Sequence, residues 1–184
     1  MKLRLLQRKD AAGMLEWMHD DEINKNFRFC AKEMTEEKAQ KFIEDSHIDA
    51  AHKRNIHLAI ADENDEYLGT ISLKNIDWEA KTAEYAISLR RMAQGKGIAF
   101  DATQELIQYA FCTLGLNRIY LNVLPANQRA VHLYEKCGFQ YEGTFRNHIC
   151  IRGKIVSLKW YGLLKEEYLF ARKSTLRIEK IKII

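Results

Sequence analysis

Two glycines and a lysine stand directly before an amphipathic helix in residues 90–111, RRMAQGKGIAFDATQELIQYAF. Apolar residues follow at three- and four-residue spacing, which predicts one buried helix face. These residues are Ile98, Ala102, Leu106, Ile107, Ala110 and Phe111. Gly95 and Gly97 therefore fall at the helix N-terminus, where unpaired N–H groups and the positive end of the helix dipole favour a phosphate. A simple structural loop is the alternative at this point.

The order of strand-like and helix-like segments predicts a mixed α/β fold. A short strand and two helices precede three strand-like runs, and the glycine turn with its helix, a strand, a short helix and a hairpin follow. The strand-like runs occupy residues 3–7, 56–62, 67–77, 82–89, 117–125, 139–149 and 156–164. We expect one domain, residues 1–170, with a central mixed, mostly antiparallel sheet flanked by helices, and then a basic C-terminal tail at 171–184.

Length, charge and hydropathy exclude several other classes of protein. At 184 residues the chain is long enough for one hydrophobic core. The N-terminus, MKLRLLQRKD, has too short an apolar run for a signal peptide, and no segment reaches membrane-spanning length. We therefore expect a cytoplasmic protein with no membrane partner. The net charge of +4 is too mild to indicate nucleic acid, and the tail lacks interleaved aromatic residues. A homodimer is compatible with the sequence.

The cysteines and histidines predict no metal site. Cys30, Cys112, Cys137 and Cys150 stand far apart without a C-x-x-C pair, and the histidines are equally scattered. Three of these cysteines have apolar neighbours, so we expect buried free thiols rather than disulfides.

Two familiar phosphate motifs fail at the glycine turn. A P-loop needs G-x-x-x-x-G-K-[ST], and nothing in the chain matches it. A dinucleotide fingerprint needs G-x-G-x-x-G, but Phe100 occupies the third position after Gly95 and Gly97.

The pattern that fits is Gln-x-x-Gly-x-Ala, at Gln94, Gly97 and Ala99. It resembles the coenzyme A pyrophosphate loop of the GNAT superfamily of N-acetyltransferases. The segment 127–139, NQRAVHLYEKCGF, is similar to that family's N-x-x-A-x-x-L-Y-x-x-x-G-F segment. The resemblance covers about residues 3–168 and implies an acetyl-CoA-dependent enzyme.

The resemblance also implies which residues bind acetyl-CoA. Amides of the glycine turn would face the pyrophosphate, with the helix dipole behind them. The strand before the turn would bond its main chain to the pantetheine arm, and Asn127 would cap a helix, contact the coenzyme, or do both. The complete set is Ile87, Ser88, Leu89, Gln94, Gly95, Lys96, Gly97, Ile98, Ala99 and Asn127.

Direct acetyl transfer to an amine needs a base for the amine, whose pKa is about 10 when free, and an acid for the departing thiolate. Tyr134 falls on the tyrosine of the family segment and is the candidate acid, although a core tyrosine is the alternative. Glu84 is the candidate base, acting through water, with a merely exposed glutamate as the alternative. Cys137 lies one turn away, and a buried thiol is a simpler interpretation than a thioester mechanism.

The whole-chain pattern looks most like the ribosomal-protein alanine, spermidine and nucleotide-amino-sugar N-acetyltransferases. We expect a small amine, an amino sugar nucleotide first, over a polyamine or a protein N-terminus; a non-catalytic acyl-CoA sensor is the other reading. Two segments would build the acceptor cleft, one acidic and one basic, unless both are plain solvated surface. They carry Asp20, Asp21, Glu22, Glu33, Glu36 and Glu37, and Arg146, His148, Arg152 and Lys154.

Overall fold

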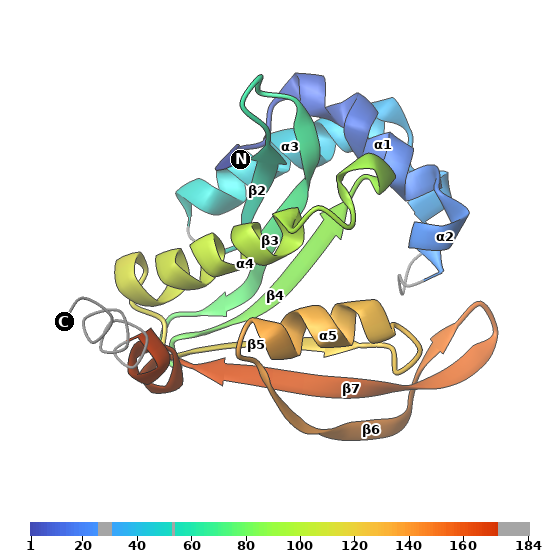
Figure 1. Cartoon of the computed structure of the whole chain (residues 1–184). Helices are drawn as coiled ribbons and strands as arrows, with labels where there is room; N and C mark the ends of the chain where they lie inside the picture. Colours follow the sequence, from blue (N-terminus) through green and yellow to red (C-terminus); the bar gives the residue numbers. More distant parts are fainter. Residues whose placement is uncertain (26–30, 53, 173–184) are drawn as a thin grey trace.

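Helices flank a central sheet in the computed structural model, which describes residues 1–25, 31–52 and 54–172 (Figure 1). The strands are β1 (Lys2–Leu5), β2 (Ile56–Ala61), β3 (Tyr67–Asp77), β4 (Thr82–Leu89), β5 (Arg118–Val123), β6 (Gln140–Ile151) and β7 (Lys154–Leu164). The labelled helices are α1 (Ala11–His19), α2 (Asp21–Asn24), α3 (Glu36–Ala51), α4 (Ile98–Gln108) and α5 (Gln128–Lys136). Residues 165–172, after β7, are also helical. Short 3-10 turns cover Arg8–Asp10, Ala31–Glu33 and Arg91–Ala93, and a π-helical turn, Tyr109–Thr113, extends α4.

The strands form one sheet in the order β1-β2-β3-β4-β5-β7-β6. Every neighbouring pair is antiparallel except β4 and β5, which run parallel. The predicted mixed, mostly antiparallel sheet is therefore confirmed. The last hairpin inserts β7 beside β5 and leaves β6 at the edge of the sheet.

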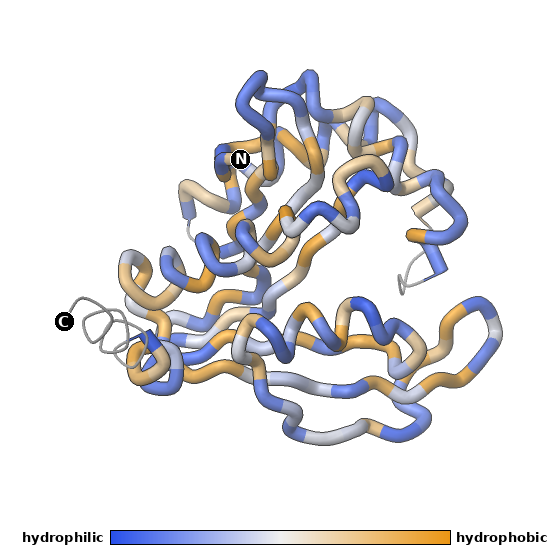
Figure 2. The backbone as a smooth tube through the Cα atoms, in the orientation of Figure 1, coloured by the Kyte–Doolittle hydropathy of each residue, from blue (hydrophilic) through white to orange (hydrophobic). Residues whose placement is uncertain are grey.

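Alternation along the strands divides the core between the two faces of the sheet. On one face, α4 and α5 cover a large apolar cluster that includes Ile71, Tyr85 and Ile119. On the other face, α1 and α3 pack on the β1–β3 side around Met14 and Ile43. The tips of the β2–β3 and β6–β7 turns are hydrophilic, as expected for solvent-facing turns (Figure 2).

The structure describes little of the predicted C-terminal tail, and it contradicts part of the prediction about the cysteines. Residues 171 and 172 of the predicted tail belong to the helix at residues 165–172, and the rest of the tail, residues 173–184, lies outside the described residues. Cys137 is buried as expected, but Cys112 and Cys150 are exposed, so the prediction of buried thiols is wrong for these two. Cys150 lies on the edge strand β6, where apolar neighbours in sequence do not guarantee burial. Within the described part of the chain, no helix is long and apolar enough to cross a membrane.

Candidate active site

The glycine turn, residues 94–99, leaves open space in front of α4. Gly95 and Gly97 adopt left-handed backbone angles, with φ of 77° and 81°. Gly97 is the N-cap of α4, and a Cβ added there would meet no heavy atom within 4 Å. Glycine adopts such angles at little cost. The turn can therefore bring its backbone against a ligand without a side chain in between.

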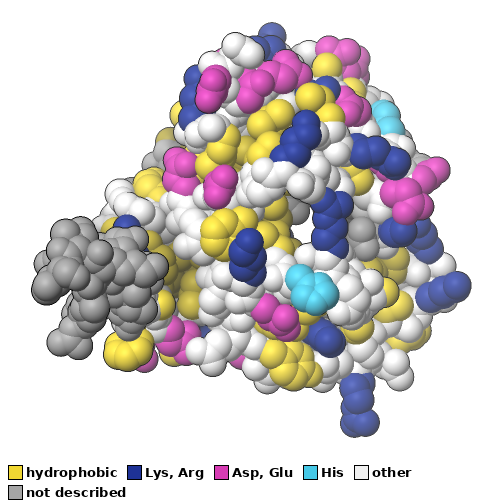
Figure 3. All heavy atoms as spheres, in the orientation of Figure 1, with side chains coloured by type: hydrophobic (Ala, Val, Ile, Leu, Met, Phe, Trp, Pro, Cys, Tyr) yellow, Lys and Arg dark blue, Asp and Glu magenta, His cyan; other side chains and the backbone are white. Residues whose placement is uncertain are grey.

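Five successive amides of this turn, at residues 95–99, donate no hydrogen bond within the described part of the chain. The first bonds of the helix come from the amides of Phe100 and Asp101, which both donate to the Gly97 carbonyl. Unpaired amides at a helix N-terminus carry partial positive charge and favour anions. The turn is thus an anion cradle, and several Lys and Arg side chains lie around this part of the surface (Figure 3).

Gln94 connects the cradle to its surroundings. Its side-chain amide donates to the Leu89 carbonyl at 3.1 Å, and its oxygen accepts a bond from Arg129 at 2.8 Å. Arg129 lies on α5, and its guanidinium is 3.8 Å from where a Cβ on Gly95 would stand. The sequence reading missed Arg129; the available signal was a cation two residues after the capping Asn127.

The parallel pair β4 and β5 separates close to the cradle (Figure 1). Pairing runs only from Thr82 with Arg118 to Glu84 with Tyr120, although β4 continues to Leu89. Ile87, Ser88 and Leu89 pair with β3 but not with β5. Half of a strand's main-chain groups point to each neighbour. Among the described residues, the β4 edge therefore has main-chain groups toward the split that β5 does not pair, although the Leu89 carbonyl already accepts the bond from Gln94. The sequence predicted the pantetheine arm at this edge.

Tyr134 sits on α5 against the buried side of β4 and is only 8% exposed. Its ring contacts Tyr85 and Phe139 at centroid distances of 5.8 and 6.1 Å. Burial raises the pKa of Tyr134 well above its ordinary value. Its hydroxyl makes no hydrogen bond with any described residue. The phenol is therefore protonated at neutral pH.

Glu84 lies on the opposite face of the sheet from Tyr134. It alternates with Tyr85 along β4, and it accepts bonds from Lys74 at 3.1 Å and Asn75 at 3.0 Å. Its side chain is 13% exposed. Because β4 and β5 separate just beyond Glu84, a ligand in the split can be reached from both faces. The acid and base candidates thus flank the split from opposite sides.

Asn127 caps α5 as predicted. Its side-chain oxygen accepts a bond from the Ala130 amide at 3.2 Å. This bond uses one lone pair of the oxygen and leaves the amide nitrogen for another partner. The helix-cap interpretation is confirmed, and the contact to the coenzyme stays a prediction.

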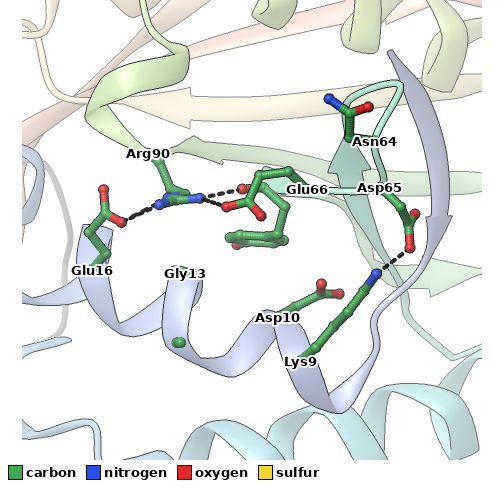
Figure 4. A pocket seen from close by; sticks show the side chains of 10 residues that line it. Lys9, Asp10, Gly13, Glu16, Asn64, Asp65, Glu66 and Arg90 are labelled. Atoms are coloured by element: carbon green, nitrogen blue, oxygen red, sulfur yellow. Dashed lines mark hydrogen bonds and ion pairs between the residues drawn. The ribbon is translucent and has the colours of Figure 1, made fainter.

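Ion pairs hold the segment that leads into the glycine turn. Figure 4 shows Arg90 between the carboxylates of Glu16 and Glu66, beside a cavity of about 370 Å³. Arg91 makes a two-pronged pair with Asp20, both bonds at 2.7 Å, and it holds the pKa of Asp20 below its usual range. These charges are paired with one another, so we interpret the cavity as scaffold and not as the reaction site.

The two segments expected to build the acceptor cleft meet in the fold. Arg152, in the β6–β7 turn, donates to the Asn24 carbonyl at the end of α2, at 3.1 Å. Asp20 caps α2 through the amides of Glu22 and Ile23 in addition to its pair with Arg91. Residues 26–30 of the acidic segment lie outside the described residues. The basic residues Arg146 and His148 line a hollow on the hairpin.

Comparisons with known proteins agree with this geometry. The family model "Acetyltransferase (GNAT) domain" matches residues 1–140. An uncharacterized N-acetyltransferase p20 of Bacillus licheniformis is 30% identical, covering 91% of this chain and 94% of the relative. A spermidine N(1)-acetyltransferase of Vibrio cholerae is also 30% identical, covering 92% and 95%. The crystal structure of spermidine N-acetyltransferase from Vibrio cholerae in complex with CoA and spermine has a TM-score of 0.81 at 26% identity, covering 91% and 97%.

The chain belongs to the GNAT acetyltransferase family. It is an acetyl-CoA-dependent N-acetyltransferase with a single α/β fold. The residues present fit that coenzyme, since the anion cradle and the open β4 edge offer the two kinds of contact that a pyrophosphate and an amide-containing arm need.

Proposed function

We propose that the protein transfers the acetyl group of acetyl-CoA directly to the primary amine of a small molecule. The row of five unpaired amides at 95–99, beside the open edge of β4, carries this proposal. The cradle would hold the pyrophosphate, Arg129 and Asn127 would add contacts from α5, and Ile87–Leu89 would bond the pantetheine arm through their main chain. This arrangement would hold the thioester in the split between β4 and β5.

Tyr134 is the proposed general acid. Its buried phenol is protonated at neutral pH, and its packing against Tyr85 fixes the ring. A phenol held in this way can give its proton to the departing thiolate. Solvent then returns a proton to Tyr134 and takes up the proton that the base has removed from the amine, so both groups return to their starting states.

Glu84 is the proposed base. Lys74 and Asn75 each occupy one of its carboxylate oxygens, which fixes the group at the end of the β4–β5 ladder. An acceptor amine that enters from this face would lose its proton to Glu84 through a water molecule. The two proton transfers would then occur on opposite sides of the split.

The preferred acceptor is a small amine that carries phosphate, such as an amino sugar nucleotide. Support comes from the hairpin, where Arg146 and His148 line an open hollow, Arg152 follows in the turn and Lys154 begins β7. A polyamine is the second candidate, because relatives named spermidine N(1)-acetyltransferase match more than nine-tenths of the chain. A homodimer remains a prediction.

A thiol-release assay tests the proposal. The wild-type protein would receive acetyl-CoA with amino sugars, an amino sugar nucleotide, spermidine or short peptides, and released coenzyme A would be measured. We expect release with at least one small amine and acetylated product in equal amount. Absence of release with every amine, from protein that binds acetyl-CoA, would contradict the proposed reaction.

A further inference from the structure

Two enclosed N–H donors stand side by side without partners on β5 and β7. Asn122 and Trp160 face each other in the antiparallel ladder. Among the described residues, neither Nδ2 of Asn122 nor Nε1 of Trp160 has a hydrogen-bond partner, although both atoms are buried. A buried donor without a partner loses its hydrogen bonds to water and gains none in return, which destabilises the fold. Such groups are rare in native proteins, and two at neighbouring positions indicate a site that a ligand completes.

Asn122 and Trp160 lie on the side of the β4–β5 split from which the amine substrate would enter. Strand alternation puts Asn122 on the same face as Tyr120, which is the ladder partner of Glu84. Asn122 lies two residues beyond Tyr120, or about 7 Å along the strand. It therefore stands where β5 has already left β4, on the face of the proposed base and away from Tyr134.

Aromatic rings surround the two donors. Trp160 stacks on Tyr120 at a centroid distance of 6.1 Å with 28° between the planes, and it contacts Phe145 at 5.0 Å. Phe145 and His148 also line the hollow of about 580 Å³ on the hairpin. A flat aromatic wall beside hydrogen-bond donors suits a molecule with an apolar face and polar edges.

The two unpartnered donors indicate which functional groups the bound substrate must carry. The Trp160 indole N–H is a hydrogen-bond donor and cannot accept, and the same holds for the Asn122 Nδ2 group. Protonated nitrogens of a polyamine are donors as well, and they cannot satisfy these two groups. We infer that the acceptor carries a hydroxyl, carbonyl or carboxylate oxygen within a few bonds of its amine and that Asn122 and Trp160 bind this oxygen. This inference rests on the proposed function and makes its substrate class narrower.

Matched amines and matched variants test this inference. Glucosamine and alanine amide carry oxygens, whereas cyclohexylamine and spermidine carry none. One neutral hydrogen bond is worth roughly 0.5–1.5 kcal/mol, a factor of about 2–13, so Asn122→Leu and Trp160→Phe should each lower kcat/KM for the oxygen-bearing amines by about that factor. Both variants should lower kcat/KM for cyclohexylamine much less than for the oxygen-bearing amines. Trp78→Phe makes the same chemical change in the β3–β4 turn and should affect no amine.

Indole N–H signals in NMR give a readout without turnover. Trp160→Phe identifies the Trp160 signal, and the bond of Trp17 to Tyr67 gives an internal reference. With coenzyme A present, glucosamine should move the Trp160 signal and cyclohexylamine should not.

Equal losses for both kinds of amine in the two variants, or wild-type preference for spermidine over the oxygen-bearing amines, would overturn the inference and leave the proposed transfer intact. No acetylation of any amine would overturn both.

Discussion

The rings of Tyr85 and Tyr134 meet edge to face, with centroids 5.8 Å apart and planes at 83°. The Tyr85 hydroxyl shares a 2.7 Å hydrogen bond with the hydroxyl of Thr103 on α4. This chain of contacts links β4 to both helices that border the split. The Tyr134 ring is therefore fixed by packing, while its hydroxyl bonds to none of the described residues.

Tyr134→Phe keeps the ring and removes only the hydroxyl. We expect the melting temperature and coenzyme affinity to stay near those of the wild type, because the packing volume is unchanged. Turnover should fall roughly 10²-fold, the usual scale for the loss of a general acid. Tyr141→Phe, on exposed β6, is the control. Near-normal turnover in Tyr134→Phe would make Tyr134 a core residue only.

Glu84→Gln should lower turnover most where the amine is still charged, because the base then matters most. The measurement is the pH dependence of kcat/KM. Lys74→Met removes the ion-pair partner but keeps the carboxylate, so it should retain most activity. If the two variants have the same profile, the pair with Lys74 is structural and Glu84 is not the base.

Gly69 permits the close approach of β3 to Ser88 and Leu89 of β4, the strand proposed to bind the coenzyme along its other edge. A Cβ at this position would lie 2.3 Å from the Ser88 carbonyl oxygen and 2.6 Å from a Leu89 methyl. Gly69→Ala should therefore displace β4 and weaken coenzyme binding measured by calorimetry. Gly162→Ala, whose Cβ would meet the flexible side chains of Glu142 and Arg118, is the strand control. If the two variants bind coenzyme A with equal affinity, Ser88 and Leu89 do not contribute to coenzyme binding.

His57 gives stability a pH dependence of known sign. Burial, with a smaller contribution from Lys74, lowers its pKa to about 4, while nearby Asp49 opposes this shift. The unfolded chain binds a proton below about pH 6.5 and the folded chain does not. The free energy of unfolding should therefore fall by about 3 kcal/mol between pH 6.5 and pH 4 from this group.

Urea unfolding at pH 7 and pH 4.5 measures this effect. His57→Gln can keep a bond to Ser72, which lies 2.8 Å from the imidazole, and should lose about 2–3 kcal/mol less than the wild type. If the free energy of unfolding falls equally in the wild type and in His57→Gln, the pH dependence comes from other groups.

Local patterns were sufficient to predict the cradle and the strands. The unpaired amides at 95–99 follow from two glycines before an apolar helix, and the Asn127 cap follows from its place before α5. Both depend on neighbours within a few residues. Strand alternation likewise predicted the hairpin of β6 and β7.

Long-range pairing supplied what the sequence could not. The bond between Arg129 and Gln94 spans 35 positions, and only the fold reveals it. The partners of Glu84 depend on the register of β3 against β4. The unpaired donors of Asn122 and Trp160 depend on the insertion of β7 beside β5, which no local pattern specifies.

Coenzyme A affinity by calorimetry in Gly97→Val and Gly115→Val most directly tests whether the glycine turn binds acetyl-CoA. The two glycines have similar backbone angles, φ of 81° and 74°, and open space around them, but only Gly97 stands at the cradle. Both substitutions should cost similar stability, since valine is strained at such angles. We predict that Gly97→Val loses coenzyme binding while Gly115→Val keeps wild-type affinity. Wild-type affinity in folded Gly97→Val would contradict the assignment of the cradle.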